Sequence, residues 1–218
     1  MSRKSRETTG LNEVILTMTE SNPRAAVERI AAFTASARPG QLTNETRQLF
    51  KRNILDSIGC AIAALPGQPF QALREQFEEY RAKGSCTLIG GGNTSADQAA
   101  LFNSGLVRYV DLLDSYMAPG GLCHPSDNFG TVLAAAEQAG ASGEEFMLAL
   151  AVAYEIQCKF SAAIPVMAKG FNHAIQLAIS ASASAGSVLD RALGGRRFGT
   201  LNRHGSAQQV NAANGGRD

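Results

Sequence analysis

The chain has 218 residues, a formal net charge of +1 and a composition that is 44% hydrophobic and 18% charged. This profile is typical of a globular domain, and the near-neutral charge predicts no binding to nucleic acid. No apolar run reaches the roughly 18 residues that a membrane span needs. No apolar segment follows the basic start MSRKSRETTG, so we expect a cytoplasmic protein that makes no membrane contact.

Four cysteines are too widely spaced to form a known metal or redox motif. They occupy positions 60, 86, 123 and 158, and no two of them form a C-x-x-C pair. An iron–sulfur cluster needs grouped thiolates, which this sequence lacks. We therefore expect Cys60 and Cys158 to be small buried apolar residues and the cysteines to hold no iron–sulfur cluster.

Helical periodicity begins after a polar segment at 1–22. Apolar spacing predicts a first helix over 24–37. Thr43 has the position of an N-cap for a long second helix, with Glu45 in its first turn. The later part of that helix, ILDSIGCAIAAL, is apolar nearly all round, so we expect it to be buried. A third helix is predicted over 70–81.

The segment SCTLIG at 85–90 is the one strand that the sequence predicts. The GGGN that follows lacks the spacing of a phosphate-binding loop, so we interpret it as a turn. Ser95 and Gln98 then have the spacing of a capping box for a fourth helix, which we expect to end near Leu113.

Three more helices follow a polar segment. Gly140 is expected to cap the fifth helix, and Ser142 with Glu145 forms a second capping box. Pro165 ends the sixth helix. These helices are predicted over 128–140, 144–164 and 174–190.

Seven helices with one minor strand predict an all-α, bundle-like fold without a repeat. We divide the chain into a flexible tail at 1–22, a helical domain at 23–193 and an atypical tail at 194–218. The last segment has few large apolar residues and no periodicity, which indicates disorder or an out-of-frame ending.

The polar segment YVDLLDSYMAPGGLCHPSDNFG at 109–130 carries most of the candidate chemistry. Asp111 and Asp114 are three residues apart and would share a face of a final helical turn. Acidic groups are unfavourable at a helix C-terminus, which indicates another role for them. His124 would lie at the start of the next helix, where backbone N–H groups attract anions. A histidine there suits proton exchange near neutral pH.

Other interpretations of this segment remain open from the residues alone. Ser126 or Asp127 could simply cap a helix, with His124 incidental. One histidine among carboxylates without ligand spacing is no zinc signature. A triad of Ser115, His124 and Asp111 is conceivable, but no G-x-S-x-G elbow accompanies it.

The block RYVDLLDSYM followed by HPSDN resembles the signature of the MmgE/PrpD family, the 2-methylcitrate dehydratase-like proteins. The segments RNILDSIGCAIAAL, AEQAGASGEEFMLALAVAYEIQCKF and KGFNH agree, and the resemblance covers about 25–193. It implies a helical domain with a smaller α/β lid, an active site between them, no cofactor or metal, and a homodimer. Members dehydrate 2-methylcitrate, decarboxylate cis-aconitate or epimerise an iminodisuccinate.

The resemblance also implies roles for particular residues. His124 matches a proton-transfer residue, and Asp111 with Ser115 matches groups that orient it and the substrate. Asp114 is a supporting candidate, and His173 matches a substrate-binding position or has a structural role. The partner is then a small carboxylate substrate, and HPSDN favours the dehydratase branch.

The sequence departs from the family after about Gly194. The α/β lid and the family's active-site lysine are missing, and the ending reads as truncated. We therefore expect a lyase with impaired activity, or else a non-catalytic helical fragment.

Overall fold

The computed structural model describes residues 23–80, 83–118 and 121–192, and the tails predicted at 1–22 and 194–218 lie outside these ranges. Within the described residues the fold is all-α, as predicted, with seven α-helices and two small hairpins. The helices are α2 (Pro23–Ser36), α3 (Asn44–Ala64), α4 (Gln68–Tyr80), α5 (Ala96–Tyr109), α6 (Phe129–Ala139), α7 (Gly143–Ala163) and α8 (Ala174–Ala192).

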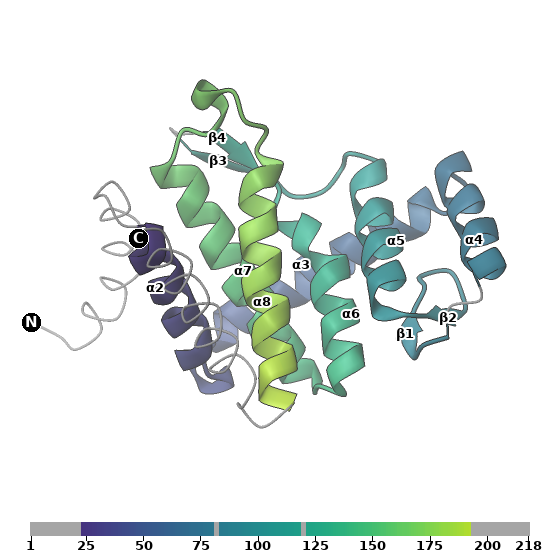
Figure 1. Cartoon of the computed structure of the whole chain (residues 1–218), viewed down its shortest axis with the longest axis horizontal. Helices are drawn as coiled ribbons and strands as arrows, with labels where there is room; N and C mark the ends of the chain where they lie inside the picture. The colour runs from purple at the N-terminus through teal and green to yellow at the C-terminus, as the bar shows by residue number, and fades with distance from the viewer. Residues whose placement is uncertain (1–22, 81–82, 119–120, 193–218) are drawn as a thin grey trace, which may run out of the picture.

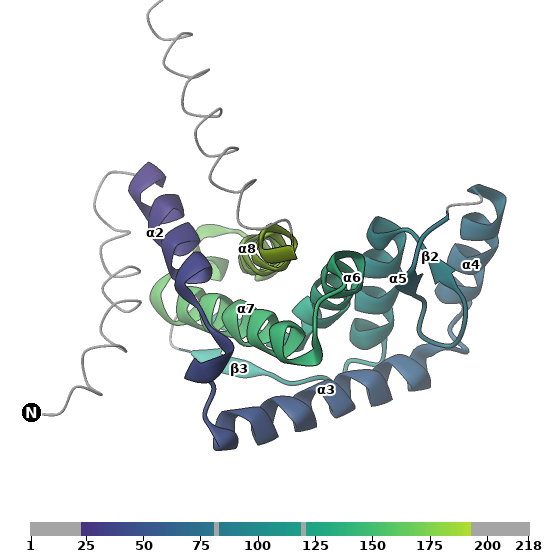
Figure 2. The same ribbon diagram turned by 90° about the horizontal axis from the view of Figure 1, so that it is seen from below.

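Helix α8 lies at the front of the bundle, between α7 and α6, and packs against both of them (Figure 1). Helix α2 flanks it on one side, while α5 and α4 extend the domain on the other (Figure 1). Figure 2 shows that α3 runs underneath, along the length of the molecule from the α2 side to the α4 side. The other helices therefore form a layer that lies over α3.

The predicted caps of three helices are confirmed. Thr43 Oγ1 accepts a hydrogen bond of 3.1 Å from the backbone N–H of Thr46 at the start of α3. Ser142 and Glu145 form the reciprocal capping box of α7, with bonds of 2.8 and 3.3 Å. Gly140 ends α6 in the left-handed conformation, with a φ of 62°. These local signals fix where the helices begin and end.

Two sequence expectations for the helices are wrong. Ser95 is the N-cap of α5, but its side chain makes no capping bond there, and the Gln98 side chain accepts from the hydroxyl of Thr94 and not from the backbone of Ser95. The later part of α3 is not buried all round, since Leu55 is 71% exposed and Ile62 is 56% exposed. The physical reason is that α3 lies on the outside of the layer and buries only one face (Figure 2).

Four short strands replace the single predicted strand. Strand β1 (Cys86–Thr87) pairs with β2 (Asn93–Thr94), and β3 (Tyr116–Ala118) pairs with β4 (Gly121–Cys123). The GGGN segment is a turn, as predicted, and its three glycines all have positive φ between 90° and 120°. Glycine suits this turn because other residues rarely adopt such angles.

The main apolar core lies between α3, α4, α5, α6 and α7. Phe102 is completely buried, and its ring meets those of Phe70 and Phe77 edge-on at 5.6 and 6.2 Å. Gly130 lets α6 approach α5 closely, because a Cβ there would lie 2.3 Å from the backbone nitrogen of Ser104. Helix α7 is apolar and long enough to cross a membrane by composition alone, but half of that window is buried inside the domain, as in an ordinary core helix.

Candidate functional site

Helix α5 ends at Tyr109, so the prediction that it reaches Leu113 is wrong. Asp111 follows with a φ of 54°, and its N–H donates 3.1 Å to the carbonyl of Arg108. Aspartate is one of the few side chains that tolerate this left-handed conformation. Asp111 and Asp114 therefore do not share a helical turn, and the chain leaves α5 toward the β3–β4 hairpin.

The hairpin delivers His124 to the interior. His124 follows β4 in an extended conformation and is only 8% exposed. It precedes a short 3₁₀ turn, η4 (Pro125–Asn128), which leads directly into α6. No side chain caps this turn, so the alternative in which Ser126 or Asp127 simply caps a helix loses its main support.

The ring of His124 is anchored through one nitrogen. Its Nδ1 lies 2.8 Å from the backbone carbonyl oxygen of Asp114 and 3.2 Å from Ser115 Oγ. A carbonyl oxygen only accepts, so Nδ1 carries the proton and donates it, and Nε2 of the neutral ring keeps its lone pair. The carboxylate of Asp114 in turn accepts 3.0 Å from the N–H of Ser126. The loop thus holds the imidazole in the tautomer that a general base requires.

An arginine connects two carboxylates beside this histidine. Arg108 Nη2 lies 3.6 Å from the exposed Asp111 carboxylate, and Nη1 lies 3.9 Å from the buried Asp127 carboxylate. Burial raises the pKa of Asp127 to about 6, although the positive charges of Arg108 and His124 oppose the rise. Asp127 therefore exchanges its proton close to neutral pH, which suits a second acid–base group.

His173 comes from the loop before α8 and meets His124. The two ring centroids are 5.5 Å apart, with the planes at 68°. Desolvation lowers the pKa of His173, and the nearby charges of His124 and Arg108 lower it further. This half-buried ring is therefore neutral at physiological pH.

Behind His124 lies a group of buried amides and hydroxyls, which we call the polar interior: Asn128, Gln157, Ser161, Gln176 and Ser180. Asn128 Nδ2 donates 2.6 Å to Gln157 Oε1, and Ser180 Oγ donates 2.8 Å to Asn128 Oδ1. Both amide atoms of Gln176 are buried without a hydrogen-bond partner among the described residues. Such orphaned groups are rare in native interiors and call for an explanation.

The sequence analysis did not identify the polar interior. Its residues come from η4, α7 and α8, far apart in the chain. The available signal was that Gln157, Gln176 and Ser180 fall on the inward faces of otherwise apolar helices, where polar residues are seldom buried without a role.

The structure thus brings four of the five predicted site residues into one loop cluster. Ser115 and the backbone of Asp114 contact His124, and His173 lies against its ring. Asp111 points to Arg108 instead, and its side chain is 74% exposed. Its predicted orienting role, like the other catalytic roles, stays a prediction.

Within the described residues, no group of three or more His, Cys, Asp or Glu side chains gathers in a way that would hold a metal ion. The thiols near the site are free. A hydrogen bond from Cys158 lowers the pKa of Cys123 and correspondingly raises that of Cys158.

Residues 28–192 match the MmgE/PrpD N-terminal domain. Over 186 residues the chain is 24% identical to the cis-aconitate decarboxylase-like protein oryM of Aspergillus oryzae (strain ATCC 42149 / RIB 40). The alignment covers 80% of this chain but only 38% of that protein. No solved structure matches the chain. Because the match to the N-terminal domain covers most of its length, the chain belongs to the MmgE/PrpD family.

Proposed function

We propose that the loop cluster around His124 is the acid–base centre of a lyase that acts on a small di- or tricarboxylate, with dehydration of a 2-methylcitrate-like substrate as its reaction. The observation that carries the proposal is the hydrogen bond from His124 Nδ1 to the carbonyl of Asp114, which leaves Nε2 able to accept a proton. Family membership supports the same chemistry.

In the proposed reaction, His124 Nε2 takes a proton from the carbon beside a substrate carboxylate. The C–O bond on the neighbouring carbon then breaks, a C=C bond forms, and the leaving hydroxide takes a proton from Asp127 and departs as water. A carboxylic acid with a pKa near 6 is matched to that second transfer. The guanidinium of Arg108 supplies a cation for a substrate carboxylate.

Decarboxylation of cis-aconitate is the second candidate, favoured by the name of the relative from Aspergillus oryzae. In that reaction the C–C bond to a carboxylate breaks, CO₂ leaves, and protonated His124 returns a proton to carbon. Both candidates need a histidine that changes its protonation state beside carboxylates. They differ in the product and in whether CO₂ is released.

The test is to incubate the purified chain with 2-methylcitrate and with cis-aconitate, following the unsaturated product by ultraviolet absorbance and CO₂ separately. We expect formation of the unsaturated product from 2-methylcitrate, and a loss of roughly 100-fold or more in rate for His124→Gln. Gln76→Ala, at an exposed position of α4, is the control and should keep the rate of the unaltered chain.

Release of CO₂ from cis-aconitate without dehydration would favour the second candidate. If a folded chain turned over neither substrate, the proposal would fail, and the chain would be a non-catalytic helical fragment. If His124→Gln kept the full rate, the base would have to be another residue.

A further inference from the structure

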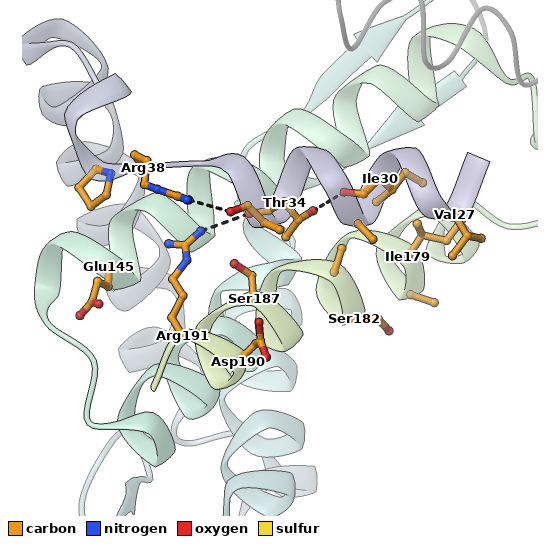
Figure 3. Close-up of a pocket in the computed structure, with 15 residues that line it drawn as sticks. Val27, Ile30, Thr34, Arg38, Glu145, Ile179, Ser182, Ser187, Asp190 and Arg191 are labelled. Carbon is orange, nitrogen blue, oxygen red and sulfur yellow. Dashed lines mark hydrogen bonds between the residues drawn. The ribbon is translucent and has the colours of Figure 1, made fainter. Parts of the chain in front are cut away.

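A large groove lies between α2 and α8, and the residues of the His124 cluster do not line it (Figure 3). Helix α2 lies on the side of α8 that faces away from α6 (Figure 1). Its volume is about 850 Å³, within the range of about 300–1,000 Å³ that is typical of pockets for small molecules. Nothing in the proposed lyase reaction uses it.

One half of the groove is apolar. Val27 and Ile30 on α2 face Ile179 on α8, and Figure 3 shows these three side chains toward the same end. Ala31 and Ala183 line the wall between the helices. Val27 is 61% exposed, so the groove is open at this end. An aliphatic chain laid along this half would remove apolar surface from water on both partners.

The other half carries two arginines that are already fixed in place. Arg191 Nη2 donates to the carbonyl oxygens of Thr34 and Ala37, at 3.2 and 3.1 Å. Arg38 Nη1 donates to the carbonyls of Ala35 and Ala37, at 2.7 and 2.8 Å. The shared acceptor on Ala37 holds the two guanidinium groups near each other at the end of α2. The remaining donors of each planar fork are therefore pre-organised for an anion.

Two further observations indicate that this end is incomplete without a ligand. The hydroxyl of Ser187 lines the groove, is 7% exposed as a residue, and has no hydrogen-bond partner among the described residues. Desolvation lowers the pKa of Arg191 and the like charge of Arg38 adds to this effect, whereas the negative charge of Glu145 opposes it. A carboxylate placed between them would satisfy the hydroxyl and relieve the repulsion.

Two acidic residues line the groove, Glu145 and Asp190. Asp190 has an interaction of its own, and Glu145 does not fill the role of the anion either. Glu145 lines the groove, but its carboxylate accepts hydrogen bonds of 2.8 Å from the backbone and the hydroxyl of Ser142 at the start of α7. The carboxylate of Glu145 therefore caps its own helix, α7. Figure 3 shows it apart from the line that joins Arg38, Arg191 and Ser187.

We propose that the groove between α2 and α8 binds an amphipathic monocarboxylate, with its aliphatic chain between Val27, Ile30 and Ile179 and its carboxylate on Arg38, Arg191 and Ser187. The charge at one end and the apolar wall at the other match such a ligand in polarity. A polypeptide segment that merely covers apolar surface would need only the apolar half.

The test uses decanoate and decanol as probes of equal chain length, below the concentrations at which they form micelles. The chain contains no tryptophan, so Val27→Trp places a single fluorescent reporter at the open apolar end. Emission is titrated with each probe in this background, alone and combined with Arg191→Gln, Arg38→Gln or Ser182→Phe. Ser182 lines the groove from an exposed position, so a larger side chain there blocks the groove without entering the core.

We expect decanoate to bind at least roughly tenfold more tightly than decanol, because a charge-assisted hydrogen bond is worth about that much. Each arginine variant should lose roughly tenfold in affinity for decanoate and leave decanol unchanged. Ser182→Phe should abolish binding of both. Circular dichroism and label-free thermal unfolding verify that every variant is folded, since Arg191 also ties α8 to α2.

Equal affinity for the two probes would overturn the proposal and assign the groove to an apolar polypeptide partner. No emission change and no thermal shift with decanoate in the folded chain would overturn it as well. Binding that survives Ser182→Phe would place the fatty acid elsewhere. None of these results bears on turnover at His124, so this proposal and the proposed lyase function fail separately.

Discussion

The domain has two interiors of opposite character. Around Phe102, aromatic and aliphatic side chains from α3, α4, α5, α6 and α7 fill an apolar core. Around Gln176, amides and hydroxyls are just as deeply buried, yet several of their atoms make no hydrogen bond within the described part of the chain. The first interior stabilises the fold, whereas the second holds buried polar atoms that a bound group or an ordered water has to satisfy.

The cost of leaving such an atom without a partner is appreciable on the scale of protein stability. A buried polar atom that loses its partner costs about 1–3 kcal/mol, against a total stability of about 5–15 kcal/mol. Natural proteins tolerate such sites mainly where function requires them. The position of the polar interior directly behind His124 therefore supports a functional reason for it.

The largest effect is expected in the apolar core. Phe102→Ala should lower the free energy of unfolding by about 3–5 kcal/mol, because it removes a fully buried ring and leaves a cavity. Urea denaturation followed by circular dichroism measures it. Leu101→Ala is the matched control on the adjacent residue, which is 59% exposed, and should change stability by less than about 1 kcal/mol. Equal effects at the two positions would contradict the placement of the core.

In the polar interior, Asn128→Ala should cost about 3 kcal/mol. The substitution strands the buried amide oxygen of Gln157, and it leaves the buried hydroxyl of Ser180 with only its 3.1 Å bond to the carbonyl of Leu177. The same urea experiment applies, with Asn93→Ala on the exposed hairpin as the control. A loss no larger than that of the control would mean that water already satisfies these partners.

The effect of replacing Asp127 on stability is expected to depend on pH. Burial raises the pKa of Asp127 in the folded state above its unfolded value. Ionisation of this buried carboxyl therefore lowers the free energy of unfolding as pH rises from about 4 through 6. Asp127→Asn should therefore be more stable than the unaltered chain by about 2 kcal/mol at pH 7 and nearly equal to it at pH 4. Thermal unfolding at several pH values measures the difference. Asp111→Asn, at an exposed carboxylate, should lack this pH profile.

The smallest change in stability is expected at Gln176, and whether it is a gain or a loss is informative. Gln176→Leu should raise the free energy of unfolding by about 1 kcal/mol, because neither amide atom of Gln176 has a partner to lose. Gln157→Leu makes the same chemical change where the amide is bonded to Asn128, and it should destabilise the protein. The denaturation midpoints of the two variants, each compared with that of the unaltered chain, test this prediction. Destabilisation by both would show that Gln176 is bonded in solution.

Sequence patterns predicted the helical part well because its signals are local. The cap at Thr43, the capping box at Ser142 and the terminator at Gly140 each act within one turn of helix. The prediction failed at Ser95, because the side chain of Gln98 bonds instead to the hydroxyl of Thr94, the residue before the N-cap. It failed again at the end of α5, because the left-handed conformation of Asp111 stops the helix before the apolar pattern ends.

Only part of the candidate site could be predicted from the sequence. The segment at 109–130 could be singled out as a candidate site because its polar residues are contiguous and match the signature of the family. That the backbone of Asp114, rather than the side chain of Asp111, anchors His124 depends on how the hairpin folds back. The polar interior depends on helices that meet only in the folded domain, so Gln176 could not be paired with His124 by spacing.

The central claim is that the His124 cluster and the polar interior form a site for a small polycarboxylate. The most direct measurement is thermal unfolding of the purified chain with and without millimolar 2-methylcitrate or cis-aconitate, repeated for His124→Gln. A ligand that binds only the folded state raises the midpoint by mass action. We predict a rise for the unaltered chain that His124→Gln removes. A cooperative transition whose midpoint neither ligand moves, or an equal rise in His124→Gln, would contradict the account.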